Sequence, residues 1–125
     1  ENLYQMQFDY LKNRALSGDS FVIVGRCSET ILKEFDSVVT IFVLGDLDKK
    51  VERIMRLYEL SQNQAVKKIR EKDWKRRRYH NSFCDGKWGA SRNYDISINS
   101  SKLGVDETVE MLIDYIDRRQ QIKME

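Results

Sequence analysis

Residues 21–27, which have the sequence Phe-Val-Ile-Val-Gly-Arg-Cys, are the stretch that we expect to decide the fold. Four large apolar residues, from Phe21 to Val24, follow one another with no polar residue between them, and Gly25 ends the run. A short apolar run of this kind predicts a strand that is buried on both faces, as in a parallel sheet. Arg26 then stands at the carboxyl end of the strand, the edge at which open α/β sheets bind ligands. Its guanidinium group suits a phosphate or a carboxylate, although an ordinary surface arginine explains the pattern equally well.

Strand and helix patterns alternate along the rest of the chain. Apolar runs predict two further strands, a buried one over 38–44 and an alternating one over 95–99. The spacing of apolar residues predicts a short helical turn within 28–35 and helices over 2–17, 47–58, 61–81 and beyond Gly104. This alternation favours an α/β fold with a parallel sheet and right-handed crossovers. Three strands are too few to cover a sheet with buried central strands, so we expect the sheet to be incomplete, with strands missing from before residue 1.

The composition excludes several classes of protein. The 125 residues include 22 basic and 20 acidic ones, and the resulting net charge of +2 is smaller than a general nucleic-acid-binding protein carries. No apolar run reaches the roughly 18 residues of a membrane span, and no signal-peptide pattern is evident, so we expect no membrane partner. Two cysteines, Cys27 and Cys84, and one histidine are too few for a zinc site or a disulfide scaffold. We therefore expect reduced thiols and a cytoplasmic location.

The expected helix over 61–81 is strongly basic. Ser61 and Gln64 form a capping box at its start, with a side-chain oxygen at the N-cap and glutamine at the N3 position. Further along, eight basic residues face only Glu71 and Asp73 as acidic neighbours; they are Lys67, Lys68, Arg70, Lys72, Lys75, Arg76, Arg77 and Arg78.

The apolar side of this helix becomes charged partway along. A stripe that begins with Val66 and Ile69 continues at helical spacing to Asp73, Arg76 and His80. One interpretation is that the helix leaves the body of the protein and is solvated, with Asp73 and Arg76 forming a weak surface ion pair. The other is that this side faces a polar cleft, in which arginines close over phosphates and offset the charge that develops during phosphoryl transfer.

The segment after the basic helix contains Gly86 and Lys87 but no phosphate loop. Asn81 stands where that motif needs glycine, and Trp88 stands where it needs serine or threonine. We expect Trp88, Tyr94 and Tyr79 to be packing anchors of this return segment rather than stacking platforms. His80 has no acid–base partner near it in the sequence, and we expect it to be structural.

Taken together, these segments resemble the cytidylate kinase-like family, a branch of the P-loop nucleoside-monophosphate kinases. The resemblance covers the chain from about Leu3 to Ile116 and rests on the order and spacing of four motifs, namely Val22–Cys27, Asp73…Arg76…Tyr79–His80, Gly86–Lys87–Trp88–Gly89, and Asn93–Tyr94–Asp95 running into Asn99–Gly104. It implies a three-layer P-loop kinase-like α/β fold, incomplete here because the N-terminal strand and the phosphate loop are not among these residues. It makes residues 1–125 one partial domain, within which 61–94 form a lid-like helix and its return loop.

The resemblance also implies an activity, the transfer of the γ-phosphoryl group of ATP to a nucleotide acceptor with Mg²⁺ as the cofactor. Arg26 and Asp73 match positions that bind the substrate, and Arg76 and Arg70 match catalytic arginines of the lid, Arg70 with a shift of up to one residue. No residue here matches the phosphate loop that holds ATP and Mg²⁺. The resemblance therefore assigns no cofactor or metal ligand to this chain, and we expect the 125 residues alone to be inactive.

Two other functions remain open from the sequence. The basic helix over 61–81 would serve a nucleic-acid-binding module, whose affinity falls steeply with salt, although the net charge makes nucleic acid the less favoured partner. A non-catalytic interaction protein is the third alternative. In either case an incomplete sheet exposes strand edges, which invites pairing with another copy of the chain as a homo-oligomer.

Overall fold

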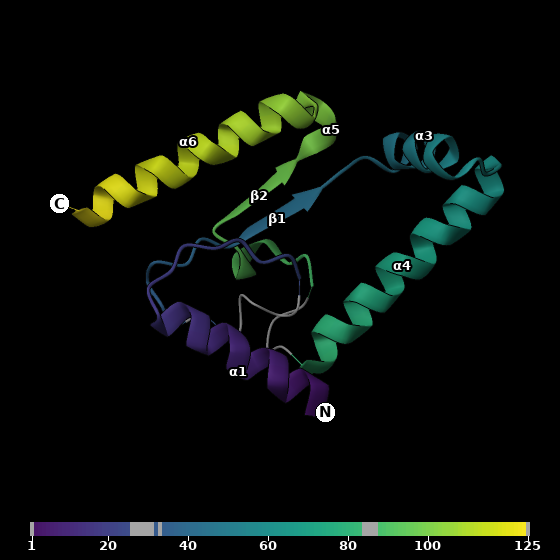
Figure 1. The fold of residues 1–125 in the computed structure, drawn as a ribbon. Coiled ribbons are helices and arrows are strands. Elements are labelled where there is room, and N and C mark those ends of the chain that lie inside the picture. Colours follow the sequence, from purple (N-terminus) through teal and green to yellow (C-terminus); the bar gives the residue numbers. More distant parts are fainter. Residues whose placement is uncertain (1, 26–31, 33, 84–87, 125) are drawn as a thin grey trace.

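The computed structural model describes residues 2–25, 32, 34–83 and 88–124. The described chain is mixed α/β and mostly helical, with a small parallel sheet (Figure 1). Its elements in order are α1 (Asn2–Leu16), β1 (Ile41–Leu44), α3 (Leu47–Tyr58), α4 (Gln62–Phe83), a 3₁₀ turn (Ser91–Asn93), β2 (Ile96–Asn99), α5 (Ser100–Leu103) and α6 (Val105–Met124).

The two strands pair in parallel, with Ile41 opposite Ile96 and Leu44 opposite Asn99. Thr40 extends this pairing by one step, because its carbonyl oxygen accepts hydrogen bonds from the amides of Asp95 at 2.9 Å and Ile96 at 3.2 Å. Helices α3 and α4 lie in the crossover between the strands, and α6 runs back along β2 toward its amino end (Figure 1). The parallel sheet expected from the alternation of strands and helices is thus present, and its two described strands lie within the segments 38–44 and 95–99.

The helices also agree with the sequence patterns. The capping box at the start of α4 is formed, since the Ser61 amide donates to Gln64 Oε1 at 3.0 Å and the Gln64 amide donates to Ser61 Oγ at 3.2 Å. Helix α6 begins directly after Gly104, whose φ of +83° is a left-handed value that favours glycine. The helical turn expected within 28–35 lies largely outside the described residues.

The described residues contain two small hydrophobic cores. The N-terminal core contains buried Leu11 of α1 and buried Leu32, surrounded by the partly buried residues Phe8, Ala15, Phe21, Ile23, Phe35 and Val38. The α3–α4 core contains Val51 of α3 and Ala65 and Ile69 of α4. Helix α4 is therefore anchored by its first turns on α3.

The buried strand expected over 21–25 is wrong. Residues 21–24 have no regular secondary structure, and the side chains of Val22 and Val24 are 91% and 89% exposed. Phe21 and Ile23, at the alternate positions, pack against the N-terminal core. A strand needs a hydrogen-bonding partner, and within the described residues the sheet consists of β1 and β2. The segment consequently buries one side only.

The strand expected over 38–44 is present but shorter and less buried. It begins at Ile41, and the side chains of Val43 and Leu44 are 52% and 39% exposed. The unbroken apolar run predicts burial on both faces. A two-stranded sheet provides too few neighbours for such burial, so β1 packs mainly through Phe42, whose ring contacts Trp88 and Tyr94.

Candidate functional site

The first candidate site lies on one side of helix α4. This is the side that is buried in the first turns of the helix. Ile69 is 8% exposed and His80 is 6% exposed, and between them on the same side lie Asp73 and Arg76. We call these four residues the inner stripe. Their arrangement agrees with the predicted change from an apolar to a charged side, and the burial of His80 agrees with a structural role for that residue.

Asp73 and Arg76 form the ion pair that their spacing predicts. The Arg76 Nη1 atom lies 3.9 Å from Asp73 Oδ1, and the side chains are 66% and 31% exposed, respectively. This distance is too long for a hydrogen bond. The pair therefore holds the guanidinium group loosely on the inner stripe, where its donors can turn toward a ligand.

Arg70 lies on a different side of α4. With 3.6 residues per turn, Arg70 and Arg76 are separated by about 120° around the helix axis. Arg70 instead lines a shallow concavity together with Glu71, Trp74 and Lys75. The structure thus brings Asp73 and Arg76 together and leaves Arg70 on the flank of the helix.

The remaining predicted site residue, Arg26, lies outside the described residues, as do Cys27, Cys84 and the Gly86–Lys87 pair. The residue before Arg26 is described, and Gly25 has a φ of +73° with nothing near the position of a Cβ atom. The chain therefore turns at the end of the 21–25 segment, in a conformation that favours glycine.

The return loop ties the far end of α4 to the sheet. The Trp88 amide donates to Asn81 Oδ1 at 3.0 Å, and the Arg77 guanidinium lies over the Trp88 ring at 5.7 Å. On the other side, the Phe42 ring of β1 meets Trp88 edge-on at 5.3 Å and Tyr94 at 5.0 Å between ring centroids. Trp88 and Tyr94 are thus packing anchors, as the sequence predicts. These contacts fix the end of α4 relative to β1.

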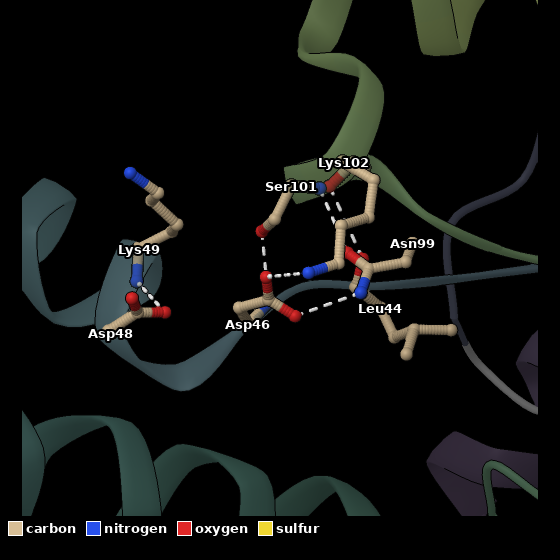
Figure 2. A network of polar contacts seen from close by, with 8 residues as sticks. Leu44, Asp46, Asp48, Lys49, Asn99, Ser101 and Lys102 are labelled. Atoms are coloured by element: carbon tan, nitrogen blue, oxygen red, sulfur yellow. Dashed lines mark hydrogen bonds and ion pairs between the residues drawn. The ribbon is translucent and has the colours of Figure 1, made fainter.

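A second polar cluster lies where the two strands end (Figure 2). Asp46 follows β1, and its carboxylate accepts a hydrogen bond from Asn99 Nδ2 at 2.9 Å and lies 3.3 Å from Lys102 Nζ. The Asp46 amide donates to Ser101 Oγ at 2.9 Å, and the Ser101 amide donates to Asn99 Oδ1 at 2.9 Å. We call Asp46, Asn99, Ser101 and Lys102 the strand-end network.

The strand-end network stabilises the ionised form of Asp46. The hydrogen bond from Asn99 and the nearby Lys102 ammonium group lower the pKa of Asp46 below its usual value. Sequence reasoning did not assign a role to these residues. The signal was nevertheless present, because polar residues directly follow two apolar runs, and the carboxyl ends of parallel strands meet at one edge of a sheet.

The strand-end network does not form a metal site. Nowhere in the described ranges do three histidine, cysteine, aspartate or glutamate side chains gather in an arrangement that could hold a metal ion. Asp46 instead satisfies its carboxylate with an amide and an ammonium group. The network therefore acts as a polar cross-link between the loops that follow β1 and β2.

A sequence model of the cytidylate kinase-like family matches residues 1–102. The chain belongs to the cytidylate kinase-like family. The match contains Asp73, Arg76 and the whole strand-end network, and it stops before α6. The resemblance inferred from the sequence motifs is thereby confirmed.

One solved structure has a fold similar to that of this chain. The crystal structure of an uncharacterized protein from Eubacterium ventriosum ATCC 27560 is similar to this chain, with 39% sequence identity and a TM-score of 0.90. The alignment covers 93% of this chain and 73% of that protein. No curated protein matches the chain.

Among the helices of the described residues, none has both the length and the apolar character that a membrane crossing requires.

Proposed function

We propose that this chain forms the acceptor-binding and lid part of a nucleoside-monophosphate kinase-like fold, which transfers the γ-phosphoryl group of ATP to a nucleotide acceptor. Membership of the cytidylate kinase-like family supports a kinase-like relationship. The observation that carries the proposal is the position of Asp73 and Arg76, two charged residues on a helix side that is buried at Ile69 and again at His80.

In this proposal Arg76 binds the phosphate of the acceptor. A guanidinium group presents a planar fork of donors that matches two phosphate oxygens at once. An exposed ion pair contributes at most about 1 kcal/mol, so Arg76 leaves Asp73 for a phosphate at little cost. Asp73, released from this ion pair, then accepts hydrogen bonds from the sugar or base of the acceptor.

The other two arginines complete the proposed site. Arg26, the next residue after Gly25 in the sequence, would bind the acceptor, and Arg70 would add positive charge from the flank of α4. The return loop supports this role for α4, because Phe42, Trp88 and Tyr94 fix the end of the helix relative to β1. Residues 61–94 then act as the lid within a single domain spanning 1–125.

ATP and Mg²⁺ belong to the proposed reaction, but the residues described here do not fit them. No group of three metal-ligating side chains occurs among the described residues, and the 125 residues contain no match to a phosphate loop. We therefore assign no step to this chain that involves either cofactor. For the 125 residues alone we expect acceptor binding without phosphoryl transfer. We also propose that the complete fold has the three-layer arrangement of a P-loop kinase and that the protein is cytoplasmic.

Titration calorimetry with cytidine, uridine, adenosine and guanosine monophosphates, and with inorganic phosphate, tests the proposal. We expect one monophosphate to bind more tightly than the others and more tightly than phosphate. Arg76→Ala should weaken the binding of that monophosphate by about tenfold to a hundredfold, because a hydrogen-bonded charged contact contributes roughly 1.5–3 kcal/mol. Lys67→Ala is the matched control, since Lys67 lies on the opposite side of α4, nine residues before Arg76 and about 180° away.

Equal losses from Arg76→Ala and Lys67→Ala would show that the helix attracts anions without forming a pocket. Equal affinity for all four monophosphates and for inorganic phosphate would contradict a nucleotide acceptor. Thermal unfolding of each variant shows that a loss of binding does not come from a loss of fold.

A further inference from the structure

The side of α4 opposite the inner stripe carries an exposed tryptophan among charged residues. We call this side the outer face and define it by five exposed residues, Lys67, Glu71, Trp74, Lys75 and Arg78. Trp74 is 55% exposed and is the one large apolar residue of the outer face. It belongs to neither core, so packing within the described chain does not explain its place.

The surroundings of Trp74 suit a flat aromatic ligand. The Arg78 guanidinium lies over the Trp74 ring, 5.1 Å from its centroid. Trp74 also lines the shallow concavity, together with Arg70, Glu71 and Lys75. An aromatic ring flanked by cationic groups stacks nucleobases of any sequence, because every base presents a π-face and the cations attract the neighbouring phosphates.

The excess of basic over acidic residues in this chain lies on α4. The helix contains eight basic and two acidic residues, which leaves 14 basic and 18 acidic residues in the rest of the chain. The net charge of +2 therefore hides a basic helix on an acidic body. From Lys67 to Arg78 the outer face is about 16 Å long, at 1.5 Å per residue. That length spans about five nucleotides of stacked strand at 3.4 Å each.

We infer that the outer face of α4 binds single-stranded nucleic acid, with a base stacked on Trp74 and phosphates along Lys67, Lys75 and Arg78. This inference does not depend on the proposed kinase function, because it uses the opposite side of the helix. An anionic membrane is the less suitable partner, since membrane-surface helices bury a continuous apolar side and the outer face has one apolar residue. An acidic protein would use the lysines but would not account for the exposed ring.

Fluorescence anisotropy with a labelled single-stranded RNA of twelve nucleotides and mixed sequence tests the inference on the 125-residue chain. Trp74→Ala should weaken binding by about fivefold to a hundredfold, which is the range measured for removing one stacking ring. The double variant Lys75→Ala/Arg78→Ala should weaken binding and reduce the slope of log K against log salt by about 1.4, or 0.7 for each lost phosphate contact. Glu71→Gln should tighten binding, because Glu71 is the acidic residue of the outer face.

The double variant Lys49→Ala/Arg53→Ala on α3 is the matched control, since it removes the same two charges from exposed positions off the outer face. We expect its affinity for the RNA to stay within about twofold of the unmodified chain, apart from a general salt-dependent change. Trp74→Ala should also leave monophosphate binding unchanged, so that this inference and the proposed function can fail separately.

Three results would overturn the inference. The first is unchanged RNA affinity of Trp74→Ala together with equal losses from the two double variants, which indicates non-specific attraction of a polyanion. The second is equal affinity for a duplex of the same sequence, which excludes stacking. The third is tighter binding to phosphatidylserine vesicles or to a poly-glutamate peptide than to the RNA at the same salt concentration.

Discussion

Asp95 connects the start of β2 to two distant segments. Its carboxylate accepts a hydrogen bond from the Thr40 amide at 2.9 Å and lies 3.1 Å from Arg119 Nη1 on α6. Partial burial raises the pKa of Asp95, but the hydrogen bond from Thr40 and the Arg119 guanidinium outweigh it, so the pKa is lower than usual. Arg119 also approaches the Val38 carbonyl oxygen at 3.5 Å. Asp95 and Arg119 therefore hold α6 against the start of the sheet.

The lowered pKa of Asp95 predicts a specific dependence of stability on pH. A carboxyl with a lower pKa in the folded than in the unfolded chain stabilises the fold above its unfolded value, here 3.8. That contribution is lost as the pH falls through the folded pKa. Asp95→Asn should reduce the free energy of unfolding at neutral pH by on the order of 1 kcal/mol. It should also flatten the fall in stability below about pH 4.

Urea denaturation at several pH values between neutral and acid measures both effects. Asp114→Asn is the control, because Asp114 makes an exposed ion pair with Arg118 within α6 and holds no two elements together. A variant Asp95→Asn with the stability and acid dependence of the unmodified chain would show that the Arg119 contact is not formed in solution.

At the scale of single residues, the sequence predicts contacts between residues that are close together along the chain. The pairing of Asp73 with Arg76 follows from helical spacing alone, and the structure forms it. The strand-end network could not be assigned in this way, since Asp46 and Asn99 are 53 residues apart and meet only because β1 and β2 are neighbours. Helical spacing also gives the side of α4 on which each arginine lies. The separation of Arg70 from Arg76 could be interpreted only once the position of the helix in the fold was known.

Among the elements, α4 has the clearest local determinants. Its start is set by the reciprocal hydrogen bonds of Ser61 and Gln64, which satisfy two amides that the first turn leaves open. Ser61→Ala should therefore lower the free energy of unfolding by about 1 kcal/mol. Ser82→Ala is the matched control near the other end, where Ser82 Oγ only donates to the Arg78 carbonyl oxygen within the helix.

Chemical denaturation followed by circular dichroism compares the two serine variants. We expect Ser82→Ala to be neutral or slightly stabilising, since alanine is the better helix former. Equal destabilisation by both substitutions would mean that the capping box does not define the start of α4.

The elements also show where a pattern of apolar residues is insufficient. Helices α1, α3 and α4 and strand β2 follow from local spacing and capping, and the structure contains all of them. The run over 21–25 has the composition of a buried strand, yet Val22 and Val24 are exposed. Burial and strand pairing depend on neighbours that a local pattern does not specify.

As a whole, the molecule is open. It exposes 9763 Å² for a mass of 14.9 kDa, whereas a compact monomer of this mass exposes about 7,000 Å². Several large apolar residues contribute to this exposed surface, among them Val22, Val24 and Val43. Exposed apolar residues and an open strand edge favour association with another chain.

We therefore predict that the chain self-associates as its concentration increases. The double variant Val22→Lys/Val24→Lys should shift the sedimentation profile toward the monomer, because charges on an exposed apolar segment oppose its burial against another chain. Leu16→Lys is the control, since Leu16 is 72% exposed at the end of α1 and lies off this segment. A monomer at every concentration, or equal effects of both variants, would contradict association through residues 21–24.

The proposed function depends most on whether the inner stripe of α4 binds the phosphate of a nucleotide acceptor. Nitrogen-15 NMR with detection of arginine Nε–H and tryptophan Nε1–H groups tests it most directly during titration with nucleoside monophosphates. We predict a saturable shift of the Arg76 Nε–H signal with the preferred monophosphate, while the Trp74 Nε1–H signal on the outer face stays in place. Shifts centred on Trp74 with Arg76 unmoved would place nucleotide binding on the opposite side of the helix and contradict the proposed function.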